Sequence, residues 1–144
     1  MPAQVFGELR PDTATHGEKK VLSRLQANLP KEYSVYVECP LHDDRMERYP
    51  DFIVLTNYGV IVLEVKDWVH IEYADKHTAE VRTRKNQFRK ERNPVITARE
   101  YAIQLSQMLQ NELKSELPRL KSRFPWVFLR AVMALLPKAF PSTL

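Results

Sequence analysis

The sequence is poor in several features that would point to particular kinds of site. A single cysteine, Cys39, excludes an internal disulfide and a cysteine-based zinc site, and it fits a reducing compartment. Three glycines in the whole chain leave no glycine-rich loop for nucleotide phosphates. The longest apolar run, residues 126–137, is too short to span a bilayer and contains Arg130. Since no signal peptide opens the chain either, we expect a cytoplasmic protein that does not enter a membrane.

What remains is the composition of an ordinary globular protein. The 144 residues are enough for one domain with a hydrophobic core. Hydrophobic residues make up 44% of the chain and charged residues 28%, proportions that are typical of such domains. The formal net charge of +4 is compatible with a polyanionic partner without identifying one.

Two apolar segments in the middle of the chain predict a β-hairpin. Residues 52–55 and 60–65 are nearly all β-branched or large and apolar, and residues 57–59, Asn-Tyr-Gly, supply the turn. Because neither segment alternates strictly between apolar and polar residues, we expect a sheet that is covered on both faces.

Three ionisable side chains belong to this hairpin. Glu64 and Lys66 are two residues apart and therefore point to the same face of their strand. A two-residue turn at Asn57 and Tyr58 would place Asp51 directly opposite Glu64, with the Cβ atoms about 5 Å apart. A type I turn with a glycine bulge would shift the register by one residue and move Asp51 to the other face. We expect the first register.

Opposed carboxylates in an apolar hairpin predict a cation site. Two neighbouring carboxylates repel each other, and burying them without a partner is costly. Mg²⁺ or Mn²⁺ would resolve this conflict, because hard cations prefer oxygen ligands. Lys66 beside the metal would then orient or deprotonate an attacking water and stabilise charge on a phosphate. The alternative is an ordinary pair of Glu64 and Lys66 on a solvated strand, with Asp51 as a turn residue.

The order and spacing of these residues resemble a known group of nucleases. Pro50-Asp51 followed by Glu64-Val65-Lys66 is similar to the signature of the PD-(D/E)xK superfamily. Within that superfamily, about residues 15–137 resemble the nuclease-related domain (NERD) family. That resemblance rests on Gly17-Glu18 at a helix start, the strand that begins at Asp51, the segment 59–66 and Asn93-Pro94. The family often carries a glutamine a few residues after Asn-Pro, where this chain has Thr97.

The resemblance implies both an architecture and a site. The implied fold is α/β, with a three-layer restriction-endonuclease-like core in which helices flank a central mixed β-sheet. Asp51, Glu64 and the backbone carbonyl of Val65 are the implied ligands of Mg²⁺ or Mn²⁺, and Lys66 positions the water. Hydrolysis in the manner of the superfamily would leave a 3′-hydroxyl and a 5′-phosphate.

Glu18 lies near the start of a predicted helix that runs from residue 15 or 16 to residue 28. It shares an apolar stripe with Val21 and Leu25, at helical spacing. Its carboxylate could complement the helix dipole in the first turn, or it could point over the sheet toward the cation. The resemblance favours the second role, in which Glu18 completes or tunes the catalytic metal site.

A basic stretch over residues 82–92 predicts contacts with phosphates that are independent of base sequence. Glu91 is the only acid within it, and Arg48, close to the first strand of the hairpin, is a further candidate. The alternative for the stretch is a solvated loop on a basic protein. The candidate nucleic-acid-binding residues are Arg48, Arg82, Arg84, Lys85, Arg89, Lys90 and Arg92.

The remaining segments supply the expected framework. We expect strands at residues 33–39, 69–73, 79–83 and 126–136, with a polar loop over residues 40–50. A second helix is expected from Asn93-Pro94 to about residue 117, with Tyr101 and Gln104 beside its buried stripe. In domain terms, residues 1–14 are an N-terminal arm, 15–137 the nuclease domain, and 138–144 a tail that leads into a further domain.

Together with the resemblance, these residues predict a Mg²⁺- or Mn²⁺-dependent deoxyribonuclease that acts in DNA repair, processing or defence. DNA is the expected partner, and the resemblance adds a fused or associated helicase. The alternative is a catalytically inactive module with the nuclease fold that binds nucleic acid or tethers another protein.

Overall fold

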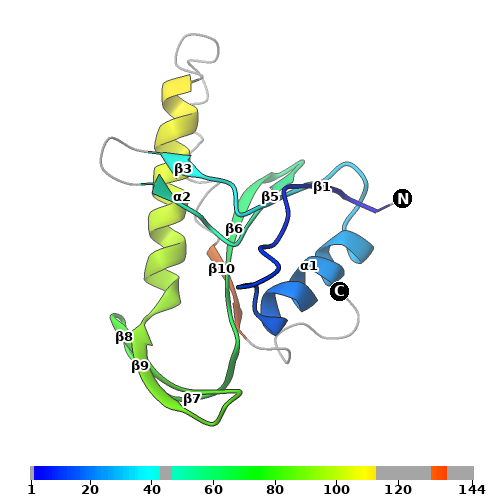
Figure 1. Cartoon of the computed structure of the whole chain (residues 1–144). Helices are drawn as coiled ribbons and strands as arrows, with labels where there is room; N and C mark the ends of the chain where they lie inside the picture. The colour runs from blue at the N-terminus through cyan, green and yellow to red at the C-terminus, as the bar shows by residue number, and fades with distance from the viewer. Residues whose placement is uncertain (1, 43–46, 113–130, 136–144) are drawn as a thin grey trace.

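The computed structural model describes residues 2–42, 47–112 and 131–135. Its elements form a mixed α/β fold around one five-stranded sheet in the order β1-β2-β5-β6-β10 (Figure 1). The strands are β1 (Gln4–Phe6), β2 (Ser34–Val37), β5 (Phe52–Thr56), β6 (Gly59–Lys66) and β10 (Ala131–Leu135). The inner strands β2, β5 and β6 are antiparallel, whereas β1 and β10 run parallel to their neighbours.

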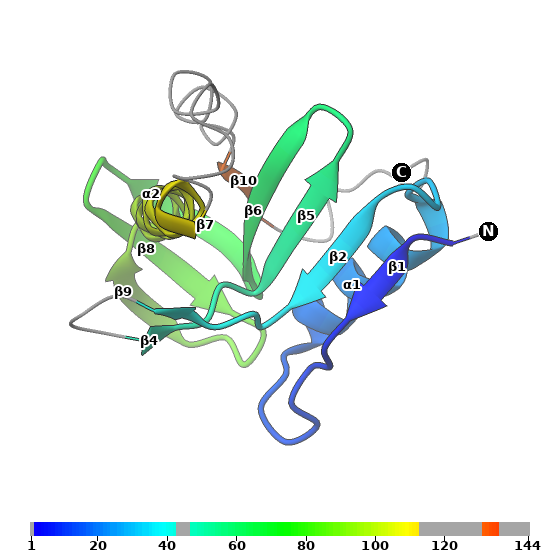
Figure 2. The same ribbon diagram turned by 90° about the horizontal axis from the view of Figure 1, so that it is seen from above.

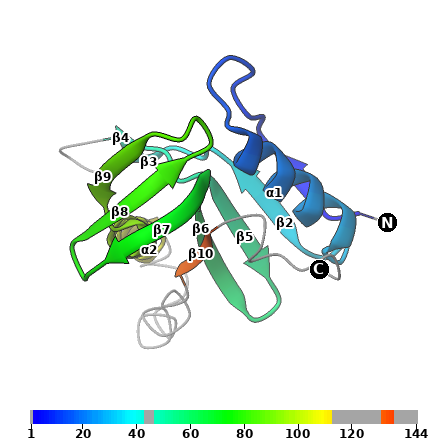
Figure 3. The same cartoon turned by 90° about the horizontal axis from the view of Figure 1, so that it is seen from below.

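The two helices of the described chain pack on opposite faces of this sheet. Helix α1 (His16–Asn28) contributes Val21 and Leu25 to a core with alternate residues of β2, β5 and β6. Helix α2 (Pro94–Glu112) contributes Ala102 and Leu105 to a second core with the intervening residues of β5 and β6. Figure 3 shows α1 running across β1 and β2, on the face of the sheet opposite to α2.

This arrangement explains why the hairpin strands are apolar without strict alternation. Phe52 and Val54 face α1, whereas Ile53 between them faces α2. A strand buried on both sides needs apolar residues at successive positions. The expected hairpin and both expected helices are therefore confirmed, although residues 113–117, the expected end of the second helix, lie outside the described residues.

A second sheet extends from the end of β6. It consists of β7 (Trp68–Ala74), β8 (Thr78–Thr83) and β9 (Phe88–Arg92) in sequence order, all antiparallel. The predicted hairpin of β7 and β8 is confirmed. Strand β9 was not predicted, and it replaces the solvated loop considered for the basic stretch. A short ribbon of β3 (Leu41–His42) and β4 (Glu47–Arg48) lies where a polar loop was expected.

The ends of the chain also differ from expectation. Residues 4–6, expected in an irregular arm, form β1, and Ala3 before them is buried in the core on the α1 side. The expected closing strand is represented by β10, which pairs in parallel with β6; the rest of residues 126–136 lies outside the described residues. Within the described chain, neither helix is both long enough and apolar enough to cross a membrane.

Substituting Gly7 with alanine is expected to lower the free energy of unfolding by about 1–3 kcal/mol. Gly7 has φ +87°, and an added Cβ would lie 2.6 Å from the backbone oxygen of Val37, so that both strain and a clash oppose a side chain. Urea denaturation of Gly7→Ala tests this. The neighbouring exposed change Glu8→Ala should stay within about 0.5 kcal/mol of the wild type, and equal stability of both variants would contradict the argument.

Candidate active site

The register of the hairpin β5–β6 places the candidate site. Thr56 pairs with Gly59 and Leu55 with Val60, so the turn has two residues and the register with a one-residue shift is excluded. Thr56 supports this turn, because its hydroxyl donates to the Gly59 carbonyl at 2.8 Å and accepts from the Tyr58 N–H at 3.0 Å. The pairing continues to Phe52 opposite Leu63, which puts Asp51, one residue earlier, at the level of Glu64.

Three of the predicted site residues come together at this end of the hairpin. The Asp51 carboxylate accepts a hydrogen bond from the Val65 backbone N–H at 2.8 Å. The Lys66 ammonium lies 3.1 Å from Oε1 of Glu64. Glu64 is only 7% exposed, which is unusual for a glutamate and is tolerated only with a charged partner or a proton.

Burial raises the pKa of both carboxyl groups. Desolvation and the charge of Glu64 raise the pKa of Asp51 to about 8, against the opposing effects of the Val65 N–H and Lys66. Desolvation also raises the pKa of Glu64, while Lys66 counteracts it. The pair therefore retains a proton near neutral pH, because two buried carboxylates side by side resist full ionisation.

These residues line a cleft of about 410 Å³ between the hairpin and the second sheet. We call it the site cleft. Five carboxylates and four cationic side chains line it. The carboxylates are Glu18, Asp51, Glu64, Asp67 and Glu91, and the cations are Lys66, Arg84, Lys85 and Arg89. With all groups ionised, the lining carries one net negative charge, which opposes the entry of a phosphate unless a cation is bound.

Glu18 caps the start of α1 and also lies at the site cleft. It forms a capping box with Thr15: the Glu18 N–H donates to the Thr15 hydroxyl at 3.1 Å, and Glu18 Oε2 accepts from the Thr15 N–H at 2.7 Å. It also lines the site cleft, where its charge contributes to the raised pKa values of Asp51 and Glu64. Gly17 allows this close approach, since a Cβ there would lie 3.2 Å from Asp67 Oδ1.

The donor set fits a hard divalent cation that keeps much of its water. Asp51, directly before β5, and Glu64 on β6 offer carboxylate oxygens. Val65, between Glu64 and Lys66 in the sequence, offers a backbone carbonyl. Among the described residues there is no group of three or more histidine, cysteine or acidic side chains arranged to hold a metal. Mg²⁺ accepts one or two protein carboxylates plus water, so two carboxylates suffice for it.

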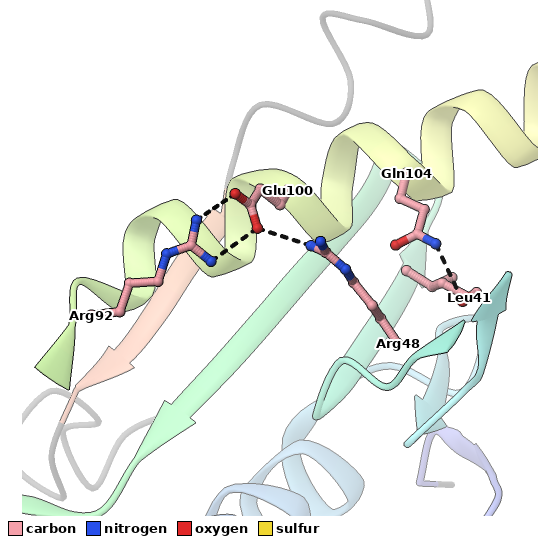
Figure 4. A network of polar contacts seen from close by, with 5 residues as sticks. All are labelled: Leu41, Arg48, Arg92, Glu100 and Gln104. Carbon is pink, nitrogen blue, oxygen red and sulfur yellow. Dashed lines mark hydrogen bonds and ion pairs between the residues drawn. The ribbon is translucent and has the colours of Figure 1, made fainter. Parts of the chain in front are cut away.

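The basic stretch divides into paired and unpaired cations. Arg82 bonds to Glu72 at 2.7 Å and Arg84 to Asp67 at 2.9 Å. Arg92 and Arg48 both bond to Glu100 on α2 (Figure 4). Lys85, Arg89 and Lys90 have no carboxylate partner within the part of the chain that the structure describes. Of the predicted phosphate contacts, Arg84, Lys85 and Arg89 line the site cleft, whereas Arg48, Arg82, Lys90 and Arg92 do not.

Three residues at or near the candidate site were missed or given too small a role in the sequence analysis. Asp67 was expected to serve only structure; it lines the site cleft and anchors Arg84. Trp68, the first residue of β7, follows it, and its indole N–H donates to Glu91 at 2.7 Å, which joins β9 to the start of β7. The pKa of Tyr101 on α2 is raised by burial and by the charges of Glu64 and Asp51, so its hydroxyl group is close enough to interact electrostatically with both carboxylates. Only the position of Asp67, directly after Lys66, could have suggested its role.

Comparison with known proteins identifies the family of the chain. The fold and the site define a mixed α/β protein in which Asp51, Glu64 and Lys66 lie together at the end of a hairpin. Residues 13–133 match the family model described as nuclease-related domain, NERD. Because this match covers most of the chain, the chain belongs to the nuclease-related domain family, as its motifs predicted. No curated protein and no solved structure matches the chain.

Asp51→Asn is expected to stabilise the metal-free protein by roughly 1 kcal/mol or more at pH 8, because it removes the ionisation of a desolvated carboxyl group beside the charge of Glu64. Asparagine keeps an oxygen for the Val65 N–H. A carboxyl whose folded pKa is raised destabilises the fold as pH rises from its usual 3.8 toward about 8, so the advantage of the variant grows over this window.

Thermal melts in EDTA between pH 5 and about 8 measure the effect, with the exposed change Asp12→Asn as the control. A constant difference in melting temperature across the pH range would contradict the assignment of the raised pKa to Asp51.

Proposed function

We propose that the chain is a metal-dependent nuclease that hydrolyses phosphodiester bonds of DNA. The observation that carries the proposal is a buried Glu64 and a partly buried Asp51 beside Lys66, at the end of a hairpin that forms one wall of the site cleft. Membership of the nuclease-related domain family supports it. The packing of α1 and α2 on opposite faces of the central sheet agrees with the three-layer restriction-endonuclease-like core that we propose for it.

Each residue of the cluster has a separate task in this proposal. Asp51, Glu64 and the Val65 carbonyl would hold Mg²⁺ or Mn²⁺, which supplies Lewis acidity and charge to the scissile phosphate. Glu18, at the cleft wall, would accept hydrogen bonds from water in the site. Lys66, held by Glu64 at 3.1 Å, would donate a hydrogen bond to the attacking water or to a phosphate oxygen. In-line attack would then leave a 3′-hydroxyl and a 5′-phosphate.

A non-catalytic nucleic-acid-binding module is the second candidate. Lys85 and Arg89 favour it, because they line the cleft without a carboxylate partner among the described residues and would attract phosphates whether or not a bond is cut. The buried pair of Asp51 and Glu64 argues for the nuclease instead. A binding surface gains nothing from two acids whose burial costs stability.

Lys66→Ala and Glu64→Gln are each expected to lower the cleavage rate at least about 100-fold, because each removes a group that acts on the reacting phosphate or its metal. Cleavage of a labelled single-stranded oligonucleotide and of its duplex is followed in Mg²⁺, in Mn²⁺ and in EDTA. The exposed turn change Lys76→Ala is the matched control and should cleave like the wild type. Cleavage that persists in EDTA or in both site variants would reject the assigned residues.

Binding should depend on the unpaired cations of the cleft more than on the paired ones. Replacing Lys85 and Arg89 together with alanine should lower the slope of log affinity against log salt by about 2, roughly one unit for each lost phosphate contact. The double change Arg82→Ala and Arg92→Ala removes the same charge, yet these guanidinium groups are already paired with carboxylates, so a smaller change is expected. Fluorescence anisotropy across a salt series measures both slopes, and equal slopes would contradict this division.

A further inference from the structure

A second hollow of about 440 Å³ lies at the ends of β1 and β2 and shares no lining residue with the site cleft. Its aromatic lining is Phe6, Tyr36 and Tyr49, and its charged lining is Glu8, Arg10 and Glu38. We call it the aromatic groove. The rings of Phe6 and Tyr36 are stacked, with centroids 5.0 Å apart and planes at 17°. The Arg10 guanidinium lies over the Tyr49 ring, 5.5 Å from its centroid.

The aromatic groove is open in the described structure. Phe6 is 45% exposed and Tyr49 41% exposed, although rings of this size are usually buried to a greater extent. Val5 and Val35, the neighbours of Phe6 and Tyr36, belong to the core beneath α1, so the two rings point to the other face of the sheet. Figure 2 views β1 and β2 with α1 behind them, and no helix of the described residues covers the near side.

The same face of the same sheet carries the candidate active site. Phe6 pairs with Tyr36, and Tyr36 pairs with Ile53 on β5. Asp51 is two residues before Ile53, a distance of about 7 Å along the strand, and its side chain shares that face. The groove and the site are also joined by the backbone, since the Glu38 N–H donates to the Asp51 carbonyl at 3.1 Å. Tyr49 stands two residues before Asp51 on the other side of Pro50.

The charges of the groove select bases rather than phosphates. Glu8 and Glu38 outnumber Arg10, and Glu38 already forms an ion pair with it at 3.6 Å. A phosphate backbone would therefore avoid the groove and follow Lys85 and Arg89 in the site cleft. Nucleobases are uncharged, and each has a face that stacks on an aromatic ring, whatever the sequence. In a duplex these faces are hidden by the neighbouring base pairs, so only an unpaired strand can offer them.

We propose that the aromatic groove binds unpaired bases next to the scissile phosphate, so that the substrate of this site is a single-stranded nucleic acid. The inference rests on the proposed nuclease function for the identity of the site, but the groove and its rings stand apart from the catalytic residues. One strand would run over both surfaces, with its phosphates at the cations of the site cleft and its bases on Phe6 and Tyr49.

Binding to a labelled single-stranded 12-mer and to the duplex of the same length tests the proposal, by fluorescence anisotropy in Mg²⁺. The full chain carries Glu64→Gln to prevent cutting. Phe6→Ala and Tyr49→Ala are each expected to weaken single-strand binding at least about fivefold and to change duplex binding less than twofold. Phe6→Trp should restore the affinity, which separates stacking from a loss of folding. Tyr58→Ala, at the far turn of the hairpin and 88% exposed, is the matched control and should bind normally.

Cleavage of an abasic strand separates this inference from the nuclease proposal, because such a strand offers phosphates without bases. With Glu64 intact, the wild type and Phe6→Ala should cleave the abasic strand equally, whereas Phe6→Ala should raise the KM for an ordinary single strand. Unchanged single-strand affinity in both aromatic variants, or a parallel loss of duplex affinity, would overturn the proposal that the aromatic groove binds unpaired bases. If those variants lose single-strand affinity but the wild type cleaves no strand, the result would support base binding by the aromatic groove and overturn the proposed nuclease function.

Discussion

The desolvation of two neighbouring carboxylates, a buried Glu64 and a partly buried Asp51, is the constraint on which the candidate site depends. Asp51 directly precedes β5 and Glu64 lies on the neighbouring β6, where water cannot fully solvate either charge. Their repulsion is offset in part by the Val65 N–H and in part by Lys66. Apolar residues at these two positions would give a more stable fold, because like charges that are shielded from water are costly. The repulsion between the two carboxylates favours the binding of a divalent cation, because both groups can then serve as its ligands.

The scaffold holds this pair in place from both sides. Helices α1 and α2 bury alternate residues of β5 and β6, so a slip of the hairpin register would exchange the two cores and move Asp51 away from Glu64. Gly17 lets the start of α1 approach the end of β6, which brings the capping glutamate Glu18 to the cleft. The fold therefore uses the same contacts to exclude water from its core and to position its acids.

Beyond the hairpin, the charged residues divide into two kinds. Glu100 joins Arg48 of β4 and Arg92 of β9 to α2, so these two arginines connect elements that are distant in sequence. The pair of Asp67 with Arg84 connects the residue that follows β6 to the turn after β8, and the hydrogen bond from Trp68 to Glu91 joins β7 to β9 within the second sheet. Of the three cations in the basic stretch without a carboxylate partner among the described residues, Lys85 and Arg89 line the site cleft, where they can meet a phosphate. A basic stretch in a sequence thus overstates the charge available to a ligand.

The sequence by itself determined the hairpin and the shared face of Glu64 and Lys66, because strand parity is local. It allowed two turn types at residues 57–59, and the pairing of Thr56 with Gly59 decided between them. The same locality made both helices predictable from the spacing of apolar residues and from the capping residues Thr15 and Asn93. Only the tertiary structure decided that residues 4–6 join the sheet, that residues 88–92 form β9, and which arginines are already paired. Those outcomes depend on partners far along the chain, and short polar segments carry no periodicity that would reveal such partners in advance.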